Sequence, residues 1–315
     1  MIKKAAKTRL IVICGATATG KTAVSVEVAK KINGEIISCD SMQVYKKMDI
    51  GTAKVTKQEM ESIPHHLIDI VSVSESFSAA KYKELALMAI EEIKNKGKEP
   101  IIVGGTGLYL DTLLLNANFS TVSKDEDLRK SLYDLEEKNG KGYLKKMLAE
   151  FDPLMADKLP ENDLVRLVRA IEVYKLTGIT KTEQNKRSKE IKSDFEPIII
   201  CLGYKNREKL YENINKRVDL MIENGLVQEV ESLKNEFGEN KTALNGIGYK
   251  EILGYLNGEY SLNDAINMIK QGSRHYAKRQ ITWFKRYENA TFINVDETPD
   301  VPKATLDILS KYGIL

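Results

Sequence analysis

The stretch that decides the fold reads Gly15, Ala16, Thr17, Ala18, Thr19, Gly20, Lys21 and Thr22. It matches the pattern G-x-x-x-x-G-K-[ST], with an apolar run at residues 10–14 before it and an amphipathic helical pattern at residues 22–32 after it. In this context backbone N–H groups and a helix N-terminus surround phosphate oxygens. Lys21 adds a full positive charge, and the Thr22 hydroxyl can ligate Mg²⁺. The stretch therefore predicts a phosphate cradle, but it does not distinguish ATP, GTP and an alkyl diphosphate.

The segments around this motif alternate between strand and helix patterns. Four apolar runs predict buried strands at residues 10–14, 35–39, 100–103 and 197–203. Ser78 has the position of an N-cap for a helix that runs to about residue 96, and Asn33 with Gly34 ends the helix at residues 22–32. Strand–helix alternation predicts a parallel sheet flanked by helices, with ligands beyond the carboxyl ends of the strands. We therefore predict an α/β fold of the P-loop NTPase type.

The middle of the chain has a different pattern. Residues 116–196 show helices and polar loops without a convincing strand, and the last apolar run follows them. The simplest organisation is a core interrupted by a helical insertion. We expect the first part of the core at residues 1–115, the helical insertion at 116–196, and the last strand with C-terminal helices at 197–315.

Composition narrows the setting of the protein. The chain has 315 residues, enough for two domains or for one domain with an insertion. Its three cysteines are too far apart for a CxxC motif, and such a sparse count fits a reducing cytosol. The apolar run at residues 10–14 is too short for a signal peptide or a membrane span. We expect a cytoplasmic protein without a membrane segment.

Polar side chains follow the predicted strands on the ligand side of the sheet. Asp40 ends the second strand and precedes Ser41, Met42 and Gln43, while Thr106 follows the third strand in a Gly-Gly-Thr-Gly run. A carboxylate in this place can be a general base or lie near a metal. The alternative, in which Asp40 caps a turn or helix, is equally compatible with the sequence. Gln43 can donate and accept hydrogen bonds at once, which suits the reading of a base edge.

Two other segments carry charge patterns that suit RNA. In the insertion, Asp163, Arg166 and Arg169 share one helix face, although an exposed ion-pair ladder explains the same spacing. Between residues 265 and 287 there is no Asp or Glu, but there are basic and aromatic residues of the kinds that contact phosphates and stack on bases. A solvated helix face is the commoner origin of such a charge run. The candidates in this segment are Arg274, Lys278, Arg279, Trp283 and Lys285.

Some expected features are missing from the sequence. His65 and His66 are adjacent, but they lack the spacing and the third ligand of a metal site, so we expect a structural or hydrogen-bonding role for them. No apolar run ends in an Asp that would serve as a Walker B strand, and no arginine-rich lid is recognisable. Phosphoryl transfer from ATP therefore lacks some of its usual parts.

Together these motifs resemble the tRNA dimethylallyltransferases, also called tRNA isopentenyltransferases. The resemblance covers nearly the whole chain. Its most specific parts are Asp-Ser-Met-Gln-Val-Tyr at residues 40–45 and Tyr-Ala-Lys-Arg-Gln at 276–280, followed by Thr-Trp-Phe at 282–284. Further matching strings lie at residues 49–54, 64–69, 104–109, 162–172, 217–219 and 248–251.

The resemblance implies a reaction and a role for several residues. Members of the family move a dimethylallyl group from dimethylallyl diphosphate to N6 of adenosine 37, beside the anticodon of tRNA. By resemblance, Asp40 would accept the proton of N6. The P-loop, through Lys21, Thr22, Mg²⁺ and Thr17, would hold the donor diphosphate. Arg217 would stabilise the charge on departing diphosphate.

The resemblance also implies how tRNA is bound. The residues that follow Asp40 would hold the target adenine after it leaves the anticodon-loop stack. The insertion would grip the anticodon stem-loop, and the basic C-terminal helix would follow the phosphate backbone. The implied tRNA-binding residues are Asp40, Ser41, Met42, Gln43, Thr106, Arg129, Asp163, Arg166, Arg169, Arg274, Lys278, Arg279 and Trp283. We expect a cytoplasmic monomer whose partners are tRNA and dimethylallyl diphosphate.

Three other functions remain as alternatives. A P-loop phosphotransferase acting on a small metabolite is disfavoured by the missing Walker B strand and lid. An isopentenyltransferase for free adenylate would share the chemistry, but it would not require the insertion or the basic C-terminal helix. A non-catalytic RNA-binding module would not require the P-loop together with Asp40. Whether ATP binds the P-loop without reacting is left open by the sequence.

Overall fold

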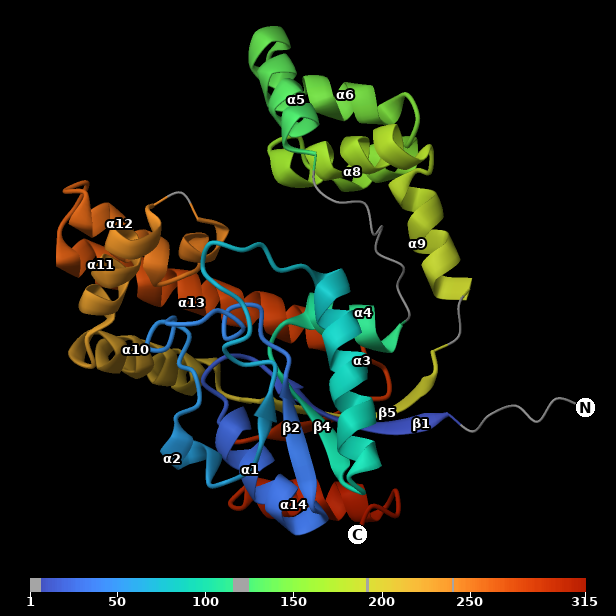
Figure 1. The fold of residues 1–315 in the computed structure, drawn as a ribbon, viewed down its shortest axis with the longest axis vertical. Coiled ribbons are helices and arrows are strands. Elements are labelled where there is room, and N and C mark those ends of the chain that lie inside the picture. The colour runs from blue at the N-terminus through green and yellow to red at the C-terminus, as the bar shows by residue number, and fades with distance from the viewer. Residues whose placement is uncertain (1–6, 116–124, 191–192, 240) are drawn as a thin grey trace, which may run out of the picture. The chain divides into compact units, whose positions relative to one another are not determined.

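The computed structural model describes residues 7–115, 125–190, 193–239 and 241–315. Its centre is a parallel sheet of six strands in the order β3-β2-β4-β1-β5-β6. The strands are β1 (Thr8–Gly15), β2 (Gly34–Ser38), β3 (His65–His66), β4 (Glu99–Gly104), β5 (Phe195–Gly203) and β6 (Thr291–Asn294). Helices lie on both faces of this sheet, which confirms the predicted α/β class (Figure 1).

The central strand β1 explains why the sheet forms at this place in the sequence. It pairs with β4 on one side, with Ile11 opposite Ile101, and with β5 on the other, with Ile11 opposite Ile198. Its apolar side chains are buried on both faces, as is usual for a parallel sheet covered on both sides. The P-loop follows β1 directly, so its position is fixed by a buried central strand.

Different helices cover the two faces of the sheet. Helices α1 (Lys21–Ile32) and α14 (Val301–Ser310) pack on each other and share an apolar cluster with the strands (Figure 1). Helix α3 (Ala79–Asn95) contacts β2 and β4, and α13 (Leu262–Phe284) contacts β1. Phe284 of α13 lies beside Val12 and Cys14 of β1. The carboxyl ends of the strands therefore open between α1 and the C-terminal helices.

The helix boundaries predicted from the sequence agree with the structure. Asn33 ends α1 in the left-handed conformation, with φ 52°, and Ser78 caps α3 by accepting a hydrogen bond from the Lys81 N–H group. The short helices of the same unit are α2 (Lys57–Met60) and α4 (Gly107–Leu114), the latter crossing into the next unit. The end signals of these elements are local, so they could be read from the sequence.

The C-terminal helices form a second packed layer beside the sheet. They are α10 (Arg207–Glu223), α11 (Leu226–Phe237), α12 (Tyr249–Leu256) and α13, with a 3₁₀ turn at Thr242–Asn245. Their apolar side chains cluster with those of residues 44–48 and 71–73. The loop that follows β2 is therefore buried against this layer, which fixes the place of the residues just after Asp40.

The chain divides into two compact units. One comprises Met1–Leu110 with Phe195–Leu315, and the other comprises Asp111–Asp194. The insertion was predicted at residues 116–196, whereas the second unit begins at Asp111 and ends at Asp194. Residues 116–124 lie outside the described residues. The described part of the second unit contains α5 (Glu126–Asn139), α6 (Tyr143–Ala149), α7 (Pro153–Lys158), α8 (Leu164–Thr177) and α9 (Lys181–Glu190). Helices α5 to α8 pack around a leucine-rich core.

Two strands were not predicted from the sequence. Strand β3 consists of His65 and His66, and β6 consists of four residues after α13. Both lie at the edges of the sheet. His66 donates or accepts through Nε2 at 2.7 Å from the carboxylate of buried Glu35, and His65 Nδ1 lies 2.8 Å from the Ile63 carbonyl oxygen. The histidines therefore have the hydrogen-bonding role that the sequence suggested.

No helix in the described residues combines the length and apolar composition needed to cross a membrane.

Candidate active site

A cavity of about 410 Å³ lies at the carboxyl ends of the central strands, within the unit of Met1–Leu110 and Phe195–Leu315. Its wall combines the P-loop, the loop after β2, the loop after β4 and three C-terminal helices. Among the residues that line it are Thr17, Ala18, Thr19, Gly20, Lys21, Thr22, Asp40, Ser41, Met42, Gln43, Gly105, Arg217, Tyr276, Arg279 and Gln280. Most residues predicted for the donor and the target base thus face one cavity.

The P-loop is held in a closed curve by its own side chains. Thr19 donates from Oγ1 to the Ala16 carbonyl oxygen at 2.9 Å, and Lys21 donates from Nζ to the same oxygen at 2.6 Å. Gly15 has φ 140°, and a Cβ there would lie 2.2 Å from the Leu202 carbonyl oxygen on β5. Only glycine fits such a position, because both the backbone conformation and the space exclude a side chain.

Two cations and one carboxylate dominate the charge of the cavity. Burial and nearby Arg217 together lower the pKa of Lys21 to about 8, while Asp40 opposes both effects. Burial also lowers the pKa of Arg217, which stays protonated because a guanidinium does not lose its proton in proteins. Arg217 Nη1 donates to Thr17 Oγ1 at 3.4 Å. Three residues predicted to act on the donor are therefore neighbours.

Asp40 has the capping role that the sequence left open, and it also lines the cavity. Its Oδ1 atom accepts the N–H groups of Met42, at 2.8 Å, and of Gln43, at 3.3 Å. In the described part of the chain no hydrogen bond engages Oδ2. One oxygen therefore fixes the carboxylate on its loop, and the other is left for a ligand in the cavity.

The residues after Asp40 are held by neighbouring loops. Ser41 donates its N–H group to Thr106 Oγ1 at 3.0 Å, which connects the loops after β2 and β4. Gln43 donates from Nε2 to the carbonyl oxygens of Thr52, at 3.4 Å, and Ala53, at 3.3 Å. The Gln43 amide thus already has backbone partners, so contact with a base edge would require it to share or exchange them.

The charged residues predicted in the insertion belong to the helical unit and form an ion-pair cluster there. Arg129 donates from Nε and Nη2 to the two oxygens of Glu172, at 2.7 and 2.8 Å, and Arg169 donates to the same carboxylate. Glu172 is fully buried, and although burial raises its pKa, the two arginines lower that pKa to about 2. Asp163 caps α8 by accepting the Arg166 N–H group, so capping of the helix explains the spacing of these two residues.

The basic residues of α13 differ in their surroundings. Arg274 donates from Nη1 to Asn215 Oδ1 on α10 at 2.7 Å, so its guanidinium already has one partner within the protein. Lys278 and Arg279 are exposed, and Arg279 also lines the cavity. Trp283 packs on the start of α4, since a Cβ at Gly107 would lie 2.3 Å from its ring, and the Arg286 guanidinium lies 4.2 Å from the ring centroid. A base that stacks on the ring face covered by Arg286 would therefore have to displace that side chain.

The sequence reasoning missed two residues of the cavity, Gln280 and Tyr276. Both belong to the Tyr-Ala-Lys-Arg-Gln string, but neither was given a role. Gln280 lies on the buried stripe of α13 with Ala277 and Phe284. A polar residue on an otherwise apolar stripe indicates a buried hydrogen bond, so the pattern could have identified it. Burial and nearby Asp40 raise the pKa of Tyr276.

The donor atoms of the cavity fit Mg²⁺ better than a metal that prefers nitrogen or sulfur. The Thr22 hydroxyl and the Asp40 carboxylate supply oxygen ligands beside the P-loop. In the ranges that the structure describes there is no group of three or more His, Cys, Asp or Glu side chains suited to a metal. Mg²⁺ usually takes few protein ligands and completes its shell with water and substrate phosphates. Thr22 therefore remains the predicted protein ligand.

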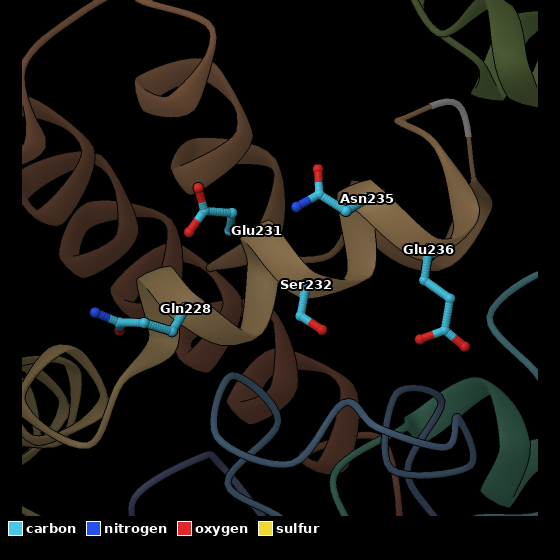
Figure 2. Close-up of a pocket in the computed structure, with 5 residues that line it drawn as sticks. All are labelled: Gln228, Glu231, Ser232, Asn235 and Glu236. Atoms are coloured by element: carbon cyan, nitrogen blue, oxygen red, sulfur yellow. The ribbon is translucent and has the colours of Figure 1, made fainter.

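A second hollow, of about 520 Å³, lies along α11 but does not resemble a ligand site. Figure 2 shows that its lining side chains all project from this one helix, in different directions. They are Gln228, Glu231, Ser232, Asn235 and Glu236. Glu236 pairs with Lys47 Nζ at 2.6 Å. The carboxylates of Glu231 and Glu236 would repel a phosphate, so this hollow does not suit a phosphate ligand. The candidate catalytic residues line the first cavity.

The chain is similar over most of its length to proteins of known type. The IPP transferase family matches residues 43–287. The tRNA dimethylallyltransferase of Acetivibrio thermocellus is 51% identical over 97% of this chain and 98% of that protein. The enzyme of that name from Caldanaerobacter subterraneus subsp. tengcongensis is 50% identical over 92% of both. A crystal structure of a eukaryotic dimethylallyltransferase acting on tRNA is 31% identical, with a TM-score of 0.78 over 96% of this chain and 78% of that one. The protein therefore belongs to the IPP transferase family, with the tRNA dimethylallyltransferases.

Proposed function

We propose that the protein transfers the dimethylallyl group of dimethylallyl diphosphate to N6 of adenosine 37 in tRNA and releases diphosphate. The observation that carries the proposal is that the cations Lys21 and Arg217 line the same cavity as the carboxylate of Asp40. Such a cavity can hold a leaving diphosphate and accept a proton from an attacking amine. Its relatives, which are named for dimethylallyl transfer to tRNA, support the choice of substrates.

The donor diphosphate fits against the P-loop. Backbone N–H groups before α1 and the Lys21 ammonium would bind its oxygens. Arg217 and the Thr17 hydroxyl, which are hydrogen-bonded to each other, would face the oxygen that leaves. Negative charge grows on this oxygen in the transition state, so cations fixed there lower the barrier. When bound, Mg²⁺ held through Thr22 would neutralise further phosphate charge.

The carboxylate of Asp40 suits the proton transfer. In the reaction the lone pair of N6 forms a bond to the terminal CH₂ carbon of the dimethylallyl group, while the bond from that carbon to the diphosphate oxygen breaks. N6 then carries an excess proton, which Asp40 accepts. Because backbone N–H groups fix Oδ1, the carboxylate is oriented before the acceptor arrives.

The remaining wall of the cavity suits an alkyl group. Ile214, Val218 and Met221 of α10 line it, together with Ile269 of α13. Apolar side chains can enclose a five-carbon chain and exclude water from the reacting carbon. A phosphotransferase for a polar metabolite would have no use for such a wall, which favours prenyl transfer.

Binding of tRNA requires positive surface and a flipped base. Lys278 and Arg279 project from α13 near the cavity, and the helical unit carries Arg166 with a side chain that is 70% exposed. Phosphate contacts of this kind position an RNA without reading its sequence. Adenosine 37 would leave the anticodon-loop stack to bring N6 to Asp40. We expect the enzyme to act as a cytoplasmic monomer.

A transfer assay tests the proposal. Purified protein is incubated with Mg²⁺, radiolabelled dimethylallyl diphosphate and unmodified tRNA, with AMP and ATP as separate acceptors. Label should enter tRNA and should be lost when adenosine 37 is replaced by guanosine. Label in AMP would assign the protein to free-nucleotide prenylation, and ATP turnover without any prenyl transfer would assign it to phosphoryl transfer. Inhibition of tRNA labelling by ATP would show whether the P-loop also binds that nucleotide.

A further inference from the structure

Helix α13 carries a buried glutamine whose amide reaches two loops of the cavity. The Gln280 side chain is 5% exposed. Its Oε1 atom accepts the Thr17 N–H group at 2.8 Å, and its Nε2 atom donates to the Gly105 carbonyl oxygen at 2.9 Å. A buried amide with backbone partners at both ends has one orientation only. Gln280 therefore joins the P-loop to the loop after β4.

The loop after β4 is shaped to receive this side chain. A Cβ at Gly105 would lie 2.2 Å from Gln280 Nε2, so any residue other than glycine would push the amide away. Glycines beside a cavity commonly allow a tight turn or the close approach of a ligand. At Gly105 the close neighbour is instead a side chain of the same protein.

The bond to Thr17 affects the donor site directly. Because the Thr17 N–H group is occupied by Gln280, it is not available to a phosphate oxygen, unlike the amides that follow it. The same bond fixes the backbone that carries the Thr17 hydroxyl, which accepts a hydrogen bond from Arg217. The contacts thus run without a gap from Gly105 through Gln280 and Thr17 to Arg217.

Helix α13 also holds the helix that carries Arg217. Lys270 Nζ pairs with Asp219 Oδ1 at 2.6 Å, and Arg274 bonds to Asn215 at 2.7 Å. Both partners lie two residues from Arg217 on α10. Helix α13, which carries Lys278, is therefore hydrogen-bonded both to the P-loop at Thr17 and to α10 beside Arg217.

We propose that Gln280 is a positioning residue: by holding the Thr17 amide against Gly105, it aligns the Thr17 hydroxyl and Arg217 with the donor diphosphate. The inference rests on the proposed prenyl transfer and adds to it a residue that acts through Thr17 and Arg217. Loss of alignment in a site of this kind reduces turnover by about 10²-fold, since catalytic groups act only within narrow geometry.

The test compares Gln280→Met with wild type. Methionine has a similar length but neither hydrogen bond. We expect kcat to fall by about 10- to 100-fold and the KM for dimethylallyl diphosphate to rise about tenfold, with the Kd for tRNA within twofold of wild type. Gly105→Ala should have the same effects, because its Cβ displaces the amide without altering Gln280. Gly203→Ala is the matched control, since its Cβ would have open space, and it should behave as wild type.

The outcomes separate this inference from the proposed function. Unchanged kcat and donor KM in both variants would overturn the positioning role, as would a rise in the tRNA Kd with an unchanged donor KM. If Gln280→Met fails to fold, Gly105→Ala carries the test. Calorimetric binding of inorganic pyrophosphate supplies a readout that does not depend on transfer: about tenfold weaker binding in the variants supports the inference, and equal binding contradicts it. Absence of prenyl transfer by the wild type would refute only the proposed function.

Discussion

The titration of Lys21 gives a quantitative test of the phosphate cradle. Burial beside Arg217 lowers the pKa of Lys21 to about 8, so this lysine changes charge within an accessible pH range. A bound diphosphate favours the ammonium form. Above pH 8 the free protein must therefore take up a proton on binding, and affinity falls as pH rises. For a pKa of about 8 in the free protein and above about 10 in the complex, the affinity should fall about tenfold between pH 7 and pH 9.

The assay is calorimetric titration of the protein with dimethylallyl diphosphate, without tRNA, across this range. Lys21→Arg is the matched variant, because a guanidinium keeps its charge throughout. The ionisation of the ligand itself affects both proteins equally and cancels in the ratio of their Kd values. We expect this ratio, wild type over variant, to rise about tenfold from pH 7 to pH 9. Wild type should also take up about half a proton on binding at pH 8.

A constant ratio over this range, with no proton uptake by wild type, would refute the reasoning. It would mean either that Lys21 has an ordinary pKa in the free protein or that its charge does not face the diphosphate.

The stability of the ligand-free protein provides an independent check that the pKa of Lys21 is lowered and not raised. The pKa of Lys21 is lower in the folded protein than its ordinary value of 10.5. The charged Lys21 therefore lowers the free energy of unfolding below pH 8, and this free energy rises as the pH increases from 8 toward 10.5. Lys21→Met should therefore raise the free energy of unfolding at pH 7 by about 1–3 kcal/mol.

Three further predictions concern other parts of the molecule. Asp40→Asn keeps an acceptor for the two loop amides but cannot take a proton. We expect kcat to fall by about 10²- to 10⁴-fold, with the Kd for tRNA within twofold of wild type. Equal losses of turnover and of tRNA affinity would contradict the role of Asp40 as a base. Lys278→Ala should reduce the slope of log Kd for tRNA against log salt by about 0.7–0.9, whereas Lys303→Ala on α14 should leave it unchanged. Glu35→Gln should lower the free energy of unfolding at pH 7 by at most about 3 kcal/mol, because burial raises the pKa of Glu35 but Lys98 and His66 outweigh it and hold the value at about 2. This difference in urea unfolding should shrink as pH falls from 4.5 to about 2, and a difference that stays constant would show that the charge of Glu35 is not its origin.

The buried strands were predictable because each leaves a strong local signal. Strands β1, β4 and β5 each contain a continuous apolar run, and β2 contains the buried pair Ile36 and Ile37, as expected for strands covered on both faces. The edge strands give no such signal. Strand β3 has only two residues, and in β6 only Ile293 is buried while Phe292 is 48% exposed. Their place in the sheet is decided by tertiary contacts, which a local pattern does not contain.

The site was predictable to the extent that its residues follow strands. The P-loop, Asp40 and Thr106 come directly after β1, β2 and β4, so parallel topology brings them to one edge of the sheet. Partners on distant helices could not be predicted in this way. Asn215 for Arg274 and Glu172 for Arg129 are set by how helices pack, and both contacts engage arginines that sequence reasoning had assigned to RNA.

The apolar wall of the cavity explains how a phosphate cradle can serve alkyl transfer. In the proposed reaction, Lys21 and Arg217 would make the diphosphate a better leaving group for any nucleophile, water included. In an open, wetted cradle the dimethylallyl donor would therefore be hydrolysed. Side chains of α10 such as Val218 and Met221 line the cavity beside Arg217, where they can exclude water from the reacting carbon. The oriented carboxylate of Asp40 would then accept the proton of an amine placed within hydrogen-bonding distance. On this proposal, the C-terminal helices rather than the P-loop would determine which reaction the site performs.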